Sequence, residues 1–240
     1  YGLVGSEMCI RDSYTTVDKE VQEGALSSLR GELSRLDIRL RGYNREEVQK
    51  EYRELEYAGD SEAGEGAFLF GRITSVETRN GEPAISVDFG GNRPEALIDG
   101  RGLEKALTAL VRFTRQRWSS PDKSDLPLLL DQLREGDKVF VSVREIGENG
   151  VLLLDLERFP ELQGAALVLQ EGAIRAMIGG MENRYFNRAV SAQRLMGSAL
   201  KPFLFTAAMQ LGWSTVDMLN NTRNVFVYQD IPYFPRPDHI

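Results

Sequence analysis

The residues best suited to do chemistry in this chain are a serine and a lysine three positions apart, Ser198 and Lys201. On a helix this spacing places both side chains on one face, about one turn from each other. A hydroxyl beside an amine can form a nucleophile with its own general base. The spacing alone does not assign that role, because Ser120 and Lys123 repeat it among Ser, Pro and Asp residues that indicate a solvated turn.

The neighbours of Ser198 distinguish it from Ser120. Ser198 follows Gly197 and opens an apolar, helix-compatible run that ends at Gly212, and Pro202 falls in the first turn, where its missing N–H costs little. We therefore expect Ser198 at the N-terminus of a buried helix, where unpaired N–H groups and the helix dipole favour developing negative charge. The alternative from the local pattern is that Ser198 is simply an N-cap.

Composition limits the other kinds of site. The 240 residues carry a net charge of −7, which argues against a nucleic-acid partner. One Cys and one His exclude an intramolecular disulfide and argue against a His/Cys metal site, so we expect no metal and no cofactor. Because His239 is next to the last residue, a Ser-His-Asp triad is not expected, and a lysine is the natural base for Ser198. No apolar run approaches the roughly 18–20 residues of a membrane span.

The elements that position Ser198 begin far upstream. Residues 1–13 fit nothing that follows and are interpreted as a non-native or disordered terminus, so Cys9 carries no weight. Residues 14–64 are expected to form a helical linker region. In it, Asp18 caps a helix with apolar residues at helical spacing, and a charged helix with a solvated face follows at 45–57. The Gly-rich segment 58–66 indicates a linker and a domain boundary.

From residue 65 the apolar period changes to two. It predicts a long strand from 67 with a bend near Gly71, a hairpin at Asn80-Gly81, and further strands at 84–89, 95–98, 138–144 and 151–156. An amphipathic helix at 102–118 separates the third strand from the fourth. This order matches a five-stranded OB-type barrel over 65–158.

A cluster of basic and aromatic residues on the 102–118 helix raises the question of nucleic-acid binding. The residues are Arg112, Phe113, Arg115, Arg117 and Trp118. OB barrels bind single strands through basic grooves with stacking aromatics. Here the cluster lies on the helix rather than on strands, and the segment is slightly acidic, so a scaffold or protein-docking role is favoured.

Residues 159–240 begin a new domain in this interpretation. Two apolar runs, 164–169 and 174–178, flank a tight turn at Glu171-Gly172, and another strand-like run lies at 225–228. A hairpin packed on one helix is too little for a stable enzyme domain. The sequence therefore predicts that this domain is incomplete.

Four stretches in this region carry a family resemblance. Residues 164–168, 176–180, 186–189 and 197–203 resemble, in order and spacing, the first strands and nucleophile helix of the penicillin-binding proteins, and Ser198–Lys201 matches their Ser-x-x-Lys motif. Residues 14–22 resemble the segment between glycosyltransferase and transpeptidase domains of class A, bifunctional members. The implied fold class is multidomain α+β, with an OB-like five-stranded β-barrel followed by the N-terminal part of a penicillin-binding/β-lactamase-like transpeptidase domain.

The resemblance implies a peptidoglycan D,D-transpeptidase. Ser198 would attack the carbonyl between the two terminal D-alanines of a stem peptide, with its own backbone N–H as one oxyanion donor and Lys201 as general base. D-alanine would leave, and the amine of a neighbouring stem peptide would take the acyl group. A β-lactam would acylate the same serine and stall.

The resemblance also implies a setting and a set of absent parts. The expected location is the bacterial cell envelope, on the periplasmic side of the inner membrane. The membrane anchor, the glycosyltransferase domain and the later Ser-x-Asn and Lys-Thr-Gly motifs are expected outside these residues, so the chain alone is expected to be inactive. Protein partners are expected at the OB-like domain. The alternatives are a non-catalytic cell-wall binding or docking protein and a serine β-lactamase-like hydrolase.

Overall fold

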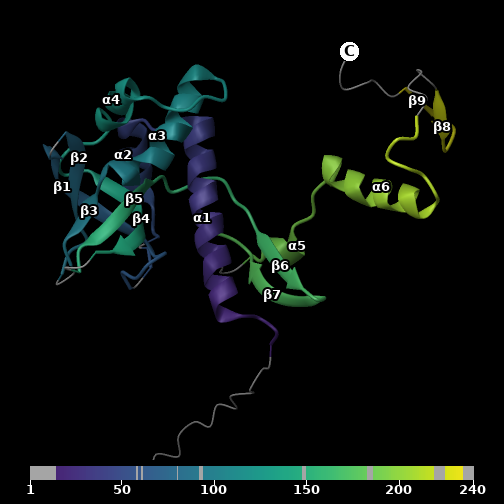
Figure 1. Ribbon diagram of the computed structural model, residues 1–240, viewed down its shortest axis with the longest axis horizontal. Helices are drawn as coiled ribbons and strands as arrows, with labels where there is room; N and C mark the ends of the chain where they lie inside the picture. Colours follow the sequence, from purple (N-terminus) through teal and green to yellow (C-terminus); the bar gives the residue numbers. More distant parts are fainter. Residues whose placement is uncertain are drawn as a thin grey trace, which may run out of the picture. The chain divides into compact units, whose positions relative to one another are not determined.

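The computed structural model describes residues 15–57, 59–60, 62–79, 81–91, 94–147, 150–182, 186–218 and 225–234 (Figure 1). The expectations for residues 1–13, for Asn80 and for His239 lie outside these ranges. The chain divides into two compact units, Tyr1–Ala192 and Gln193–Ile240, which are described separately. This division differs from the boundaries expected after residues 64 and 158, and those boundaries remain predictions.

The first helix, α1 (Lys19–Arg41), begins as predicted, because the Asp18 carboxylate accepts a hydrogen bond from the Val21 N–H. Its buried face matches the apolar stripe in the sequence only in part: Leu33 is buried as predicted. Leu36 and Leu40 are 42% and 58% exposed, whereas the side chains of Ser34 and Asp37 are fully buried. The helix therefore turns a partly polar face inward.

The second helix, α2 (Arg45–Glu54), is capped by the side chain of Asn44. Its charged residues form the solvated face that the sequence predicts, but Val48 and Tyr52 are buried and belong to the main core. The Tyr52 hydroxyl accepts a hydrogen bond from the Phe159 N–H at 3.0 Å. The helix thus packs on the end of the last barrel strand.

Five strands form a closed barrel in the order β1-β2-β3-β5-β4. They are β1 (Phe68–Arg79), β2 (Glu82–Asp88), β3 (Ala96–Ile98), β4 (Lys138–Ile146) and β5 (Leu152–Glu157). The β3–β5 pair is parallel and the other pairs are antiparallel. The five predicted strands are confirmed, and so is the mixed α+β class.

Glycines mark two close approaches in the barrel. A Cβ on Gly71 would lie 2.4 Å from the Val87 side chain, and the β1–β2 register shifts just beyond it, between Ile73 and Ser75. This is the region of the predicted bend. A Cβ on Gly102 would lie 2.0 Å from the Leu154 carbonyl oxygen, so the first turn of α3 (Gly100–Arg115) lies directly against β5.

The segment before the barrel is held in place rather than free. The Arg30 guanidinium donates to both carboxylate oxygens of Asp60 at 3.0 and 2.8 Å, and Asp60 also accepts from the Phe68 N–H at 2.8 Å. Gly59 forms a bridge with Leu69. Within the described residues, the expected linker therefore ties α1 to β1.

A separate hairpin follows the barrel, made of β6 (Ala166–Gln170) and β7 (Ala173–Ile178). Its turn is the predicted one: Glu171 and Gly172 both have positive φ, 53° and 79°, as a type I′ turn requires. The Gln22 side chain on α1 accepts from the Met177 N–H at 2.8 Å and donates to the Met177 carbonyl at 3.1 Å. Figure 1 shows α1 between this hairpin and the barrel.

Smaller elements complete the first unit and make up the second. The first unit also contains η1 (Lys123–Asp125), α4 (Leu126–Leu130) and α5 (Arg188–Ser191). In the second unit, η2 (Gly197–Leu200) leads into α6 (Lys201–Gln210), and β8 (Phe226–Tyr228) pairs with β9 (Ile231–Tyr233). The sequence reading missed β9, which contains Pro232. Among the described residues, no helix combines the length and apolar character needed to cross a membrane.

Candidate functional site

Ser198 and Lys201 both lie at the junction of η2 and α6. Gly197 has a φ of +52°, which turns the chain into the short 3-10 helix that carries Ser198, and Lys201 is the first residue of α6. In a 3-10 turn, residues three apart eclipse each other. The turn therefore places the two side chains on the same side of the chain, in the relation that the sequence spacing predicts.

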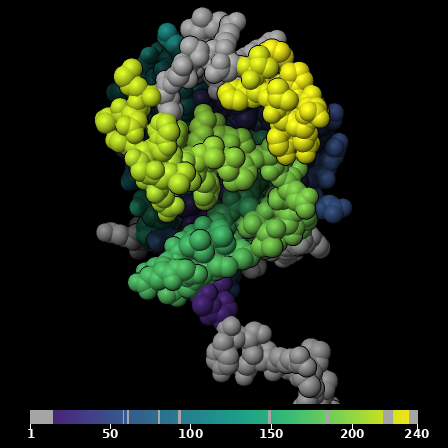
Figure 2. Space-filling model, turned by 90° about the vertical axis from the view of Figure 1, so that its right-hand side faces the viewer, coloured from purple at the N-terminus to yellow at the C-terminus, as the bar shows by residue number. Residues whose placement is uncertain are grey.

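The expected burial of this helix is wrong for the described structure. Phe203, Leu204 and Phe205 are 58–66% exposed, and the α6 segment, yellow-green in Figure 2, lies at the surface of the view. Apart from η2, the other elements described in this unit are the short strands β8 and β9, whose residues are also exposed. Among the described residues of this unit, α6 is therefore not packed into a core.

The N-cap alternative for Ser198 is also wrong. Helix α6 begins at Lys201, its N-cap residue is Leu200, and it has no side-chain capping bond. Ser198 contributes its main-chain carbonyl, which accepts from the Lys201 N–H. Across the described ranges, the Ser198 hydroxyl and the Lys201 ammonium form no hydrogen bond or ion pair, so both remain available to a ligand.

The second Ser-x-x-Lys match is the solvated turn that the sequence predicts. Ser120 and Lys123 are exposed, and Asp122 caps the short helix η1 by accepting from the Ser124 N–H at 2.8 Å. Hydrogen bonds from the hydroxyl and the N–H of Ser124 lower the pKa of Asp122. The Asp122 carboxylate is thus engaged in the turn itself.

Outside the Ser198 segment, two other kinds of site were considered: clusters of metal-ligating side chains, and the basic residues at helix α3. In the part of the chain that the structure describes, no group of His, Cys, Asp and Glu side chains could hold a metal ion. Of the basic and aromatic residues expected on the helix now seen as α3, Arg112 stacks on Trp118, and Arg39 from α1 joins it there. Arg115 pairs with Asp125 instead. Sequence reasoning missed Arg39, because its partner lies 79 positions away in the chain.

The sequence analysis also did not identify a buried carboxyl group. Glu157, at the end of β5, is 4% exposed and accepts from the Ser142 hydroxyl at 3.0 Å. Burial raises the pKa of Glu157 to about 7, against hydrogen bonds to Ser34 and Ser142 that lower it. The only sequence signal was a Glu on the outward phase of a strand, opposite to the core-facing Leu154 and Leu156, and it becomes informative once α1 is known to cover that side.

Comparison with known proteins relates the chain to one group. No family model matches it. The penicillin-binding protein 1A of Escherichia coli (strain K12) is 29% identical over 228 residues, covering 87% of this chain and 24% of that protein. The protein of the same name from Pseudomonas aeruginosa is 32% identical over 145 residues, covering 57% of this chain and 17% of that protein.

A third relative extends the comparison to another genus. The penicillin-binding protein 1A of Neisseria lactamica is 29% identical over 223 residues, covering 87% of this chain and 24% of that protein. The chain thus spans no more than 24% of the length of these three curated relatives. Over most of its residues, the chain is therefore similar to a part of proteins named penicillin-binding protein 1A.

Proposed function

We propose that the chain is part of a cell-wall enzyme, a peptidoglycan D,D-transpeptidase that uses Ser198 as nucleophile. The observation that carries the proposal is the Ser198–Lys201 pair on one side of a helical turn, in a chain similar to proteins named for binding penicillin. Gly197 supports it by its positive φ, which sets the turn immediately before the serine.

The roles of the two side chains follow from their chemistry. Lys201, in its neutral form, takes the proton from the Ser198 hydroxyl as the oxygen attacks the carbonyl between two terminal D-alanines. The C–N bond breaks, the leaving D-alanine amine takes up a proton, and an ester joins Ser198 to the stem peptide. The amine of a second stem peptide then displaces Ser198 and forms the cross-link.

The N–H groups at the start of the helical turn supply part of the charge stabilisation. The first N–H groups of a helix have no partner within it, and they favour negative charge. The Ser198 N–H is the proposed donor to the oxyanion, a type of interaction that typically contributes a factor of about 10²–10³ to the rate. We propose that a second hydrogen-bond donor to the oxyanion comes from residues other than those that the structure describes.

We also propose that residues 65–158 form an OB-type domain and that residues 159–240 begin the transpeptidase domain, after a helical region at 14–64. The barrel order β1-β2-β3-β5-β4 and the helix α3 between β3 and β4 support the first assignment. The proposed partners are peptidoglycan stem peptides, β-lactams as inhibitors and proteins that dock on the barrel. The proposed location is the periplasmic side of the inner membrane, with a membrane anchor and a glycosyltransferase domain in other parts of the protein.

Labelling with a fluorescent penicillin tests the nucleophile. In a protein of the relatives' full length, we expect stoichiometric labelling that Ser198→Ala abolishes and that Ser120→Ala, in the matched motif on the barrel side, leaves unchanged. The 240-residue chain alone is expected not to label, because α6 and Ser198 are exposed in the described structure. Labelling of the full-length Ser198→Ala variant would refute the assignment, and rapid release of the label would indicate a β-lactamase-like hydrolase instead.

A further inference from the structure

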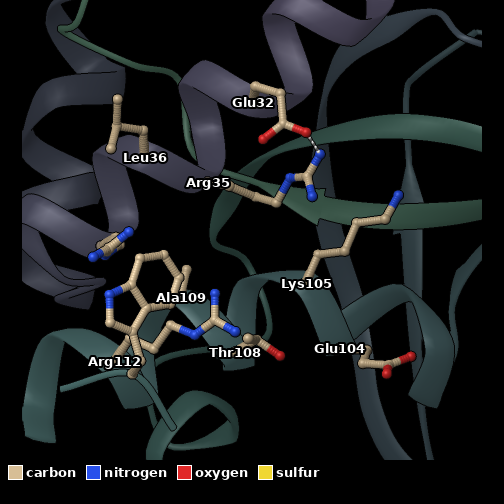
Figure 3. Close-up of a pocket in the computed structure, with 10 residues that line it drawn as sticks. Glu32, Arg35, Leu36, Glu104, Lys105, Thr108, Ala109 and Arg112 are labelled. Atoms are coloured by element: carbon tan, nitrogen blue, oxygen red, sulfur yellow. Dashed lines mark hydrogen bonds and ion pairs between the residues drawn. The ribbon is translucent and has the colours of Figure 1, made fainter. Parts of the chain in front are cut away.

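A groove in the first unit lies between α1 and α3, far along the chain from Ser198. It has a volume of about 530 Å³ and opens to solvent. Figure 3 shows its walls: Glu32, Arg35 and Leu36 come from α1, and Glu104, Lys105, Thr108, Ala109 and Arg112 come from α3. Arg39 and Trp118 complete the lining.

The lining is cationic in a chain that is acidic overall. Four of its side chains are basic (Arg35, Arg39, Lys105 and Arg112) and two are acidic (Glu32 and Glu104), whereas the whole chain carries a net charge of −7. Two of the basic groups are already neutralised. Arg35 pairs with Glu32, and the Lys105 ammonium lies 2.6 Å from a carboxylate oxygen of Asp155.

The other two basic groups stack on one indole ring. The guanidinium carbon of Arg39 lies 3.8 Å from the centroid of a Trp118 ring, and that of Arg112 lies 4.7 Å from it. In the described ranges neither arginine has a carboxylate partner, although the Arg112 Nε donates to the Ser119 carbonyl at 3.2 Å. We call these three residues, Arg39, Arg112 and Trp118, the Trp118 stack.

The Trp118 stack has the features of a preformed binding surface. Trp118 is 71% exposed, a large apolar area left in water at the mouth of a groove. Tryptophan and arginine are the residue types most enriched where binding energy concentrates at protein interfaces. Because each guanidinium is already held on the ring, less side-chain freedom is lost when a ligand binds.

We propose that the α1–α3 groove binds an acidic segment of a partner protein, whose carboxylates pair with Arg39 and Arg112 beside the Trp118 edge. Charge complementarity selects this occupant, since the two arginines are the lining cations without an anion among the described residues. The apolar Leu36, 42% exposed, offers a contact for a side chain between the carboxylates. The inference rests on the proposed docking role of the barrel and not on the chemistry of Ser198.

The test is binding of a fluorescent peptide of twelve alternating Glu and Leu residues to the full 240-residue chain, followed by fluorescence anisotropy. We expect saturable binding that weakens at least tenfold in Arg39→Glu and in Trp118→Ala, and that weakens as NaCl is raised from about 50 to about 500 mM. The matched control is Arg79→Glu, which reverses an exposed arginine on β1 outside the groove. Because Arg39 is at the surface of α1, its variant is expected to fold even if the Trp118 variant does not, and unfolding curves check both.

The alternative occupants give different results. Absence of saturable peptide binding, or equal loss in Arg79→Glu, would overturn the proposal. Tighter binding of a twelve-nucleotide single strand than of the peptide would assign the groove to nucleic acid instead. Concentration-dependent dimers abolished by Arg39→Glu would assign it to a second copy of the chain. Penicillin labelling at Ser198 is independent of all these outcomes, so the two proposals can fail separately.

Discussion

Replacing Glu157 by Gln should change how the stability of the first unit depends on pH. Glu157 is 4% exposed, and burial raises its pKa from an ordinary 4.5 to about 7. Each pH unit of displacement corresponds to about 1.4 kcal/mol, so the native state disfavours the ionised carboxylate by about 3 kcal/mol. The amide introduced by Glu157→Gln would keep the shape of the side chain and the hydrogen bond with Ser142, but it would never ionise.

The sign follows from proton binding. Between pH 4.5 and 7 the native carboxyl holds a proton that the unfolded chain has released, so the contribution of Glu157 to stability is retained below pH 4.5 and is lost as pH rises through 7. Relative to the native chain, Glu157→Gln should therefore be more stable by about 3 kcal/mol at pH 8 and by less than about 1 kcal/mol at pH 5.

Urea unfolding at pH 5, 6, 7 and 8, followed by circular dichroism, measures this difference directly. Comparing the two chains at each pH cancels the titration of the other carboxyl groups. The matched control is Glu62→Gln, which makes the same change at an exposed position. A pH-independent difference between Glu157→Gln and the native chain would refute the reasoning, because it would mean that Glu157 is charged in the native state throughout.

Further substitutions test the packing around the barrel. Gly102→Ala should destabilise the first unit by several kcal/mol in urea unfolding, because its Cβ would lie 2.0 Å from the Leu154 carbonyl oxygen. Gly24→Ala, in α1 with nothing within 4 Å, should stabilise it by about 0.5–1 kcal/mol, and the opposite order would contradict this account. Arg158→Ala should cost about 3–5 kcal/mol by thermal or urea unfolding, since it removes a fully buried cation that pairs with the buried Asp37 carboxylate, whereas the exposed Arg79→Ala should change stability by less than about 0.5 kcal/mol. Equal losses would show that the buried network contributes little.

The elements that the sequence predicted well are those set by local chemistry. The start of α1 follows from the Asp18 side chain, which reaches an N–H three residues away. The β6–β7 turn follows from two adjacent residues that adopt positive φ, Glu171 and Gly172. Such signals involve a few neighbouring residues, so they can be recognised without knowledge of the tertiary structure.

The buried face of α1 could not be predicted in the same way. Apolar spacing pointed to Leu36 and Leu40, yet the structure buries Ser34 and Asp37 instead. The partner of both is Arg158, more than 120 positions later: its N–H donates to the Ser34 hydroxyl at 2.8 Å, and its Nε lies 3.3 Å from the Asp37 carboxylate. A polar residue becomes a core residue only when a distant group satisfies it, and periodicity carries no information about that group.

In the candidate site too, the local features could be predicted and those that depend on distant residues could not. The relation of Ser198 to Lys201 is local, because it needs only one helical turn, and their shared face was predicted from the spacing. The burial of α6 was not, because it depends on surfaces beyond the helix itself. The Trp118 stack is non-local, because Arg39 and Arg112 contact the ring from two different helices, α1 and α3.

The polar contacts of α1 explain why the barrel and the hairpin belong to one unit. Gln22 binds the main chain of β7, Arg30 donates to the Met181 carbonyl at 2.8 Å and to Asp60, and Ser34 accepts from Arg158. The two bonds from the Arg30 guanidinium involve a charged group, and bonds of that kind contribute about 1.5–3 kcal/mol each. All of these hydrogen bonds are directional, whereas an apolar contact permits sliding. Helix α1 is therefore fixed in register on both sides. The same helix supplies Arg39 to the groove, so a ligand bound there contacts the element that holds the hairpin against the barrel.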